Sequence, residues 1–310
     1  MVFISHMSRF EIGRLGVALF FVLSGYWISH LWDRQTGNNR VGIFFINRFL
    51  RIWPLYIVAV FLAYLLFANP LHLTAITLLG VASAPGPHQL GVEWSLDVEA
   101  QFYLILPFLA MSRLPLVALI PACAFGWFMF DMWKTVTVAM YLPAFAAGIL
   151  LYRRRRMPLL TDGATAGLAF LALSATLFLL PETRAVLTGA RDLTAQQHDL
   201  IAMVWMLPLL PYIEASLRLR SSPFDRHLGN LSYPFYLVHE PVILAAKPFG
   251  LSKPLIALIA AALAVAFYLL LDVPFEKWRY RLLDRLRRRQ AMQPQAVPAA
   301  VSDEGGNLAE

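Results

Sequence analysis

The sequence predicts an all-α fold, a bundle of transmembrane helices, from three observations. Hydrophobic residues make up 59% of the chain and charged residues only 15%, whereas a soluble domain has roughly 45–50% and about 25%. The mean hydropathy is +0.60. The apolar residues also gather into runs near the roughly 20 residues that a helix needs to cross a bilayer. A single soluble core does not account for runs of that length.

Nine apolar runs are long enough to be read as full spans. A tenth run, residues 1–6, is too short to cross alone and lacks the shape of a signal peptide. We therefore expect nine full spans plus a truncated N-terminal span, with about two residues between the third and fourth spans, which predicts a helical hairpin there. The expected spans are 14–32, 50–68, 95–111, 114–132, 135–152, 164–181, 199–217, 231–248 and 254–272.

The domain organisation follows from these runs. Residues 1–289 form one membrane domain, and residues 290–310 are polar, with prolines and glycines, which predicts a disordered tail. The one cysteine, Cys123, excludes a disulfide framework and a multi-cysteine metal site. No metal is expected. We also see no phosphate loop, nucleophile elbow or dinucleotide fingerprint.

The basic residues predict the orientation in the membrane. If the loop after the first full span is cytoplasmic, 19 of the 26 lysines and arginines fall on that side and 7 on the other. No basic residue lies between Arg51 and Arg113, and the run Arg153 to Arg156 falls on the cytoplasmic side. The C-terminus is then cytoplasmic. Because the basic residues lie in loops between apolar runs, the net charge of +7 does not indicate nucleic-acid binding.

The span that begins near residue 95 opens with acids and a glutamine, which suits lipid poorly. On a helix, Ser95, Glu99 and Tyr103 are spaced by four and share one face, while Asp97 and Gln101 lie on another. One interpretation is a polar stripe that lines a reaction cavity. The other is an interfacial helix end whose acids reach water.

Two arginines and two histidines are further candidates for chemistry. Arg48 and Arg51 are three residues apart and predict a pair of guanidinium groups suited to phosphate, although positive-inside anchoring explains them too. His6 ends the first apolar run, and His239 lies within the span 231–248. A neutral imidazole is a suitable general base near pH 7, and a packing histidine is the alternative for His239.

Five segments, in order, resemble motifs of the acyltransferase-3 family of membrane O-acyltransferases. The resemblance extends over nearly the whole chain, and the last segment departs from it with Asp272 where glutamate is usual. The segments are SH (5–6) with LGVALFFVLSGYWIS (15–29), FFINRFLRIWPLY, WSLDVEAQFYLILP, LGNLSYPFYLVHEPVI and LDVPFEK.

The resemblance implies roles for particular residues. His6 would be the catalytic histidine, Arg48 and Arg51 would bind acyl-CoA, and Glu99 would belong to the active cavity, holding a partner histidine or the acceptor. The matching motifs place seven more residues at the substrate or cavity: Trp94, Ser95, Tyr103, Ser232, Tyr233, Tyr236 and His239.

The resemblance also implies the reaction. An acyl group, most simply acetyl, would pass from cytosolic acyl-CoA to a hydroxyl of a cell-envelope saccharide or lipid-linked glycan, in a bacterial-type inner membrane. Direct attack and a relay through an acyl-histidine both fit. The alternative is a glycan or small-molecule transporter or flippase without acyl chemistry, which buried polar residues also suit. An inverted repeat would distinguish that class, and the sequence shows none.

One departure from the family concerns the beginning of the chain. The family carries an arginine about ten positions before the catalytic histidine, and this sequence begins five residues before His6. The start is misassigned, the sequence is a fragment, or the protein is inactive; with the downstream motifs intact, we expect a misassigned start.

Overall fold

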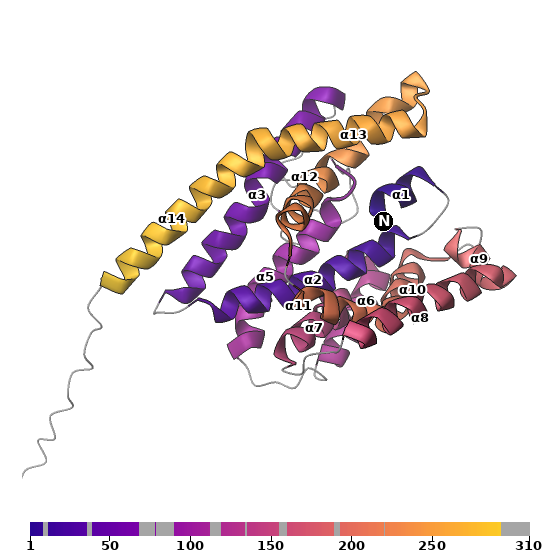
Figure 1. The fold of residues 1–310 in the computed structure, drawn as a ribbon, viewed down its shortest axis with the longest axis horizontal. Helices are drawn as coiled ribbons and strands as arrows, with labels where there is room; N and C mark the ends of the chain where they lie inside the picture. The colour runs from indigo at the N-terminus through magenta and orange to yellow at the C-terminus, as the bar shows by residue number, and fades with distance from the viewer. Residues whose placement is uncertain are drawn as a thin grey trace, which may run out of the picture.

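The structure is a computed structural model. It describes residues 1–8, 12–35, 39–67, 78, 90–111, 119–133, 135–154, 160–188, 193–219 and 221–292. Within these ranges every regular element is helical and there is no strand. The helices, shown in Figure 1, are α1 Val2–Met7, α2 Gly13–Asp33, α3 Arg40–Phe67, α5 Glu93–Met111, α6 Leu119–Trp133, α7 Val138–Arg153, α8 Leu160–Leu179, α9 Pro181–Leu187, α10 Ala195–Met206, α11 Leu210–Arg218, α12 Pro223–Ala246, α13 Lys253–Phe267 and α14 Val273–Met292.

The all-α membrane fold agrees with the sequence, but the span count of nine plus one is not confirmed. By length and composition, five helical stretches are apolar and long enough to cross a membrane: Gly13–Asp33, Arg40–Leu66, Thr161–Leu179, Gln197–Arg218 and Lys253–Arg289. Helices α6 and α7 are apolar but only 15 and 16 residues long. The expected two-residue hairpin connection, at 112–113, and the expected tail beyond Met292 lie outside the described residues.

Two glycines bring α2 and α7 into backbone contact at the centre of the bundle. A Cβ on Gly148 would lie 2.0 Å from the carbonyl oxygen of Val22, and one on Gly25 would lie 2.3 Å from that of Phe145. Small residues allow this close approach between membrane helices. Phe145 also stacks on Phe102 of α5, with ring centroids 3.9 Å apart. Helix α7 is thereby fixed against both α2 and α5.

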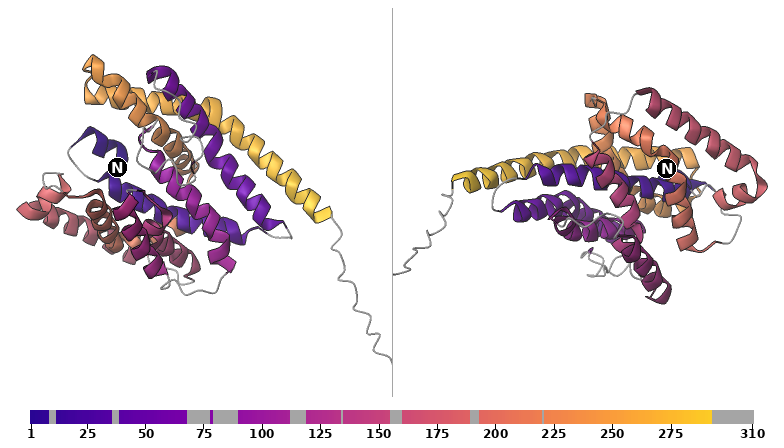
Figure 2. Two further views of the ribbon diagram at one scale, coloured as in Figure 1. Left: turned by 180° about the vertical axis from the view of Figure 1, so that it is seen from behind. Right: turned by 90° about the horizontal axis from the view of Figure 1, so that it is seen from below.

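Helices α13 and α14 form one long rod along an edge of the bundle, beside α3 (Figures 1 and 2). The expected span 254–272 therefore does not end at Asp272, and the helix continues to Met292. A π-helical turn, Tyr268–Asp272, joins the two parts. Such turns are rare and shift the side chains that follow. Here the turn places the buried Asp272 where it meets Arg51.

Helix α12 carries several of the expected site residues and begins at a capping box. Ser222 and Asp225 exchange side-chain to backbone hydrogen bonds at its start. These bonds from Ser222 lower the pKa of the exposed Asp225 carboxyl. Near its middle α12 contacts α1, where Phe3 packs edge-on against Phe235 with ring centroids 5.4 Å apart.

Candidate functional site

The acidic residues that open α5 are covered by protein. Glu93 and Asp97 are 0% exposed and Glu99 is 7% exposed. The Glu93 carboxylate accepts the backbone N–H of Leu90 just before the helix, and Asp97 accepts from Gln101 at 3.2 Å. These contacts contradict the interpretation of an interfacial helix end whose acids reach water.

Glu99 forms the middle of a line of polar side chains that follows one face of α5. Its Oε1 accepts hydrogen bonds from the hydroxyls of Tyr103, at 2.6 Å, and Ser24, at 3.0 Å. Because the spacing of four aligns residues along a helix, Glu99 and Tyr103 meet as the sequence predicts. Ser24 comes from α2, which the glycine contacts with α7 hold in place.

One turn before Glu99, Ser95 connects α5 to α12. The hydroxyls of Ser95 and Tyr236 are 2.5 Å apart, and Tyr236 also donates to the carbonyl of Val92 at 3.2 Å. Both residues were expected at the cavity. Because His239 lies about one turn after Tyr236 on α12, the line of polar groups continues from Tyr236 toward His239.

His6 and His239 lie together at this end of the line. Their ring centroids are 5.3 Å apart. The Nδ1 of His6 is 3.4 Å from Oε2 of Glu240, which follows His239 on α12. His239 is 1% exposed and its Nδ1 is 2.8 Å from the carbonyl of Tyr236.

A cavity of about 270 Å³ adjoins His6. Trp94 and Tyr236 form part of its wall, and Arg14 of α2 forms another part. Arg14 is held by an ion pair of 2.6 Å with the buried Asp199. The other residues around the cavity are small or apolar: Val2, Ser5, Gly13, Val17, Gly91 and Val92.

Arg48 lies at the opposite end of the polar line. Its guanidinium carbon is 5.6 Å from the centroid of the Tyr103 ring, a cation–π distance. It has no ion pair with another described residue, and its buried Nε has no hydrogen-bond partner there. We call the series of side chains from Arg48 through Tyr103, Glu99, Ser95 and Tyr236 to His6 the polar column.

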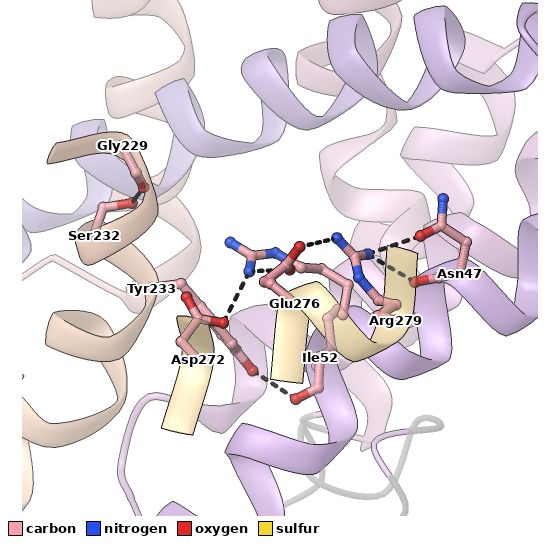
Figure 3. Close-up of polar contacts among 9 residues, drawn as sticks. Asn47, Ile52, Gly229, Ser232, Tyr233, Asp272, Glu276 and Arg279 are labelled. Carbon is pink, nitrogen blue, oxygen red and sulfur yellow. Dashed lines mark hydrogen bonds and ion pairs between the residues drawn. The ribbon is translucent and has the colours of Figure 1, made fainter. Parts of the chain in front are cut away.

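Arg51, in contrast, belongs to a network of ion pairs between α3 and the α13–α14 rod. Figure 3 shows its partners Asp272 and Glu276 together with Arg279 and Asn47. The Nη1 of Arg51 lies 2.8 Å from Glu276 Oε1 and 3.3 Å from Asp272 Oδ1. Arg279, 4% exposed, bonds the other oxygen of Glu276 at 2.5 Å and both oxygens of Asn47. The two arginines therefore do not form the expected pair of equivalent guanidinium groups.

Two more residues that were expected at the cavity, Tyr233 and Ser232, lie outside the polar column. Tyr233 belongs to the Arg51 end, where its hydroxyl donates to the carbonyl of Ile52 at 2.8 Å and its ring lies 5.4 Å from the guanidinium of Arg51. Ser232 is exposed, and its hydroxyl bonds the carbonyl of Gly229 in its own helix (Figure 3). Ser232 therefore stands apart from the polar column.

Sequence reasoning missed the acid beside the histidines. Glu99 was expected to hold a partner histidine or the acceptor, but its hydrogen-bond partners are two hydroxyls, and the carboxylate next to His6 belongs to Glu240. One signal for Glu240 was available, because an acid next to a histidine inside an apolar span is costly. Nothing in the sequence indicated the pairing of Arg14 with Asp199, which are 185 residues apart.

Comparison with known proteins gives the family. A sequence model of acyltransferase family 3, described as an acyltransferase domain, matches residues 1–273 of the 310. The comparisons with curated proteins and with solved structures found no match. The match includes the polar column and its flanking helices. The chain therefore belongs to the acyltransferase-3 family, and it is an O-acyltransferase of the membrane.

Proposed function

We propose that this enzyme moves an acetyl group from acetyl-CoA onto a hydroxyl of a cell-envelope saccharide. The observation that carries the proposal is the polar column, a series of polar side chains with an arginine at one end and a histidine beside a cavity at the other. A buried polar path through an apolar bundle is costly unless it has a function. Acyl transfer between two sides of a membrane needs such a path.

The Arg48 end receives the donor in this proposal. Coenzyme A carries a pyrophosphate and a ribose phosphate, and guanidinium binds phosphate through paired hydrogen bonds. Arg48 suits this role because it forms no ion pair with a described carboxylate, the charge of Glu99 acting on it only from beyond contact distance, whereas Arg51 is bound to Asp272 and Glu276. Arg51 then supports the site by fixing α3 against α14.

The His6 end performs the chemistry. The acceptor hydroxyl lies in the cavity, and His6 takes its proton as the oxygen attacks the thioester carbonyl carbon. The carbon–sulfur bond breaks, and the coenzyme A thiolate leaves and is protonated. General-base catalysis supplies about 10²–10⁴-fold of rate, so positioning by the cavity wall and electrostatic stabilisation must supply the rest.

The proposed orientation puts the Arg48 end in the cytoplasm. Cytoplasmic loops carry an excess of lysine and arginine, and the last described helix, α14, ends in the basic run Arg287 to Arg289. Acetyl-CoA is cytosolic, so it meets Arg48 on that side. The cavity at His6 then faces the outer side of a bacterial-type inner membrane, where envelope saccharides are modified.

Labelled acetyl-CoA and a panel of methyl glycosides, incubated with membranes that contain the protein, test the proposal. We expect transfer that is abolished by His6→Ala and reduced at least a hundredfold by Glu99→Gln, which keeps the shape of the side chain and removes its charge. His30→Gln, in the last turn of α2, is the matched histidine control, and its transfer rate should stay within about twofold of the wild type. Undiminished transfer by His6→Ala at normal protein levels would refute the assignment.

A further inference from the structure

His6 of α1 lies against α12. Phe3 of α1 packs on His239 of α12, with ring centroids 6.2 Å apart, and so places the next turn of α1 over this part of α12. His6 lies on that turn, 5.3 Å from the His239 ring and 3.4 Å, through Nδ1, from Glu240 Oε2. The side chain of Glu240 is 22% exposed and so mostly shielded from water, whereas His6 is partly open to water, with 33% of its side chain exposed.

Gly91 leaves the space that the Glu240 carboxylate occupies. It has a positive φ of 73°, which side chains other than glycine rarely tolerate. A Cβ there would lie 2.5 Å from Glu240 Cδ and within 2.7 Å of both carboxylate oxygens. The carboxylate thus rests against bare backbone just before α5. Its Oε2 is buried and forms no hydrogen bond with a described residue.

His239 is less suited than His6 to act as the base. Its Nδ1 is committed to the carbonyl of Tyr236, and the residue is 1% exposed. His6 lines the cavity, and His239 is not among the residues that do. With Nδ1 of His6 3.4 Å from Glu240 Oε2, Nε2 is the ring nitrogen that would face a substrate.

We propose that Glu240 is a positioning residue, which holds His6 with Nδ1 protonated and leaves Nε2 as the base for the acceptor hydroxyl. When Nε2 takes the proton, the carboxylate faces the resulting imidazolium and stabilises it. The proton then passes to the departing thiolate, and His6 returns to the same tautomer. The inference rests on the proposed function and adds to it a residue that orients the base.

Other charges also face this pair, and they bear on its pH dependence. They come from every element packed around it: His239 of α12, Lys247 just after α12, Glu93 of α5, Arg14 of α2 and the amino group of Met1. Glu93 and Lys247 carry charges of opposite sign, so their electrostatic effects on the Glu240 carboxylate oppose each other. All of these groups remain in a Glu240 variant, so a change in pH dependence reports the carboxylate itself.

Glu240→Gln in the full chain, purified in detergent, tests the inference. We expect kcat to fall about a hundredfold, at the lower end of what a general base supplies, with the KM for acetyl-CoA unchanged. The acidic limb of the rate–pH profile should move to lower pH, because loss of the carboxylate disfavours the imidazolium. Glu240→Asp should keep part of the activity. Asp284→Asn, a surface carboxylate on α14, is the control and should keep all of it.

A second measurement is independent of acyl transfer. Diethyl pyrocarbonate modifies neutral imidazole, and mass spectrometry of the N-terminal peptide follows His6. In Glu240→Gln, the pH of half-maximal modification should fall by about half to one unit. If the wild type transferred no acyl group, the proposed function would fail, and this measurement would still decide the pairing. A folded Glu240→Gln protein with wild-type kcat, pH limb and modification profile would overturn the inference.

Discussion

Arg48 and Arg51 lie one turn apart on α3, but their replacement by alanine should have different consequences. Arg51 binds Asp272 and Glu276, and Glu276 keeps a second partner in Arg279. Asp272 is 1% exposed and has no other hydrogen-bond or ion-pair partner among the described residues. Arg51→Ala therefore leaves this buried carboxylate without its ion-pair partner, although the charge of Arg279 still acts on it from farther away.

The expected loss of stability in Arg51→Ala follows from the loss of this ion pair with Asp272. Removing one partner of a buried ion pair costs about 3–5 kcal/mol, and we take about 3 kcal/mol because the Arg51 side chain is 22% exposed. Proteins have only about 5–15 kcal/mol of stability, so Arg51→Ala should lower the yield of monodisperse protein and the Tm clearly. Adding Asp272→Asn should restore most of the yield and of the Tm, because it removes the carboxylate charge that has lost its ion-pair partner.

Arg48→Ala should leave stability intact and weaken use of the donor. A hydrogen bond to a charged group is worth about 1.5–3 kcal/mol, which corresponds to a rise of about ten- to a hundredfold in the KM for acetyl-CoA. Lysine should rescue only in part, since it lacks the planar fork. Arg40→Ala, on the same helix with its guanidinium over Trp32, is the charge-matched control.

The measurements are size-exclusion yield and Tm in detergent for every variant, and the KM for labelled acetyl-CoA in those that fold. The sequence analysis expected both arginines to bind acyl-CoA, so on that basis both variants would lose donor binding. If Arg51→Ala proved as stable as the wild type, the ion pairs would not secure α3, and the division of roles between the two arginines would be wrong. An unchanged KM in Arg48→Ala would reduce that arginine to a topology anchor.

Two further predictions concern packing and orientation. Gly148→Ala should separate α2 from α7 and remove most of the folded protein on size exclusion. A Cβ at Gly229 meets nothing within 4 Å, so Gly229→Ala should be neutral or stabilising by up to about 1 kcal/mol. Equal behaviour of the two variants would contradict the packing argument. A reporter fused after Arg289 should read as cytoplasmic and one in the 182–198 segment as external, and external labelling of Arg153 would reverse the orientation.

The positions of the helices were largely predictable because apolar runs are a local property. The expected span 14–32 and α2 differ by one residue at each end. The continuation of α13 into α14 was missed, since residues after Asp272 become charged and no longer resemble a span. Charge ends an apolar run without ending a helix, because lysine, arginine and glutamate are good helix formers. The sequence therefore located the apolar run correctly but not the end of the helix.

The site was predictable where its geometry is local and not where it depends on tertiary contacts. Spacing along one helix correctly brought Glu99 and Tyr103 together, because their hydrogen bond joins residues four apart. Spacing could not reveal that Ser24 completes this contact or that Glu240 approaches His6, since those partners are 75 and 234 positions away. Periodicity predicts which residues share a face but gives no information about the helix that covers it.

The distribution of charge along the bundle supports different roles for its two arginines. Burying an ion-pair network costs about as much as it returns, so the contacts of Arg51, Glu276 and Arg279 are better explained by register than by stability. They tie Asn47 and Arg51 of α3 to the rod and so fix the turn that carries Arg48. A guanidinium that must bind and release a phosphate group cannot itself be held by carboxylates. Within one turn of α3, the ion pairs of Arg51 hold the helix in register, and Arg48, which forms no ion pair, stays able to bind and release a phosphate group.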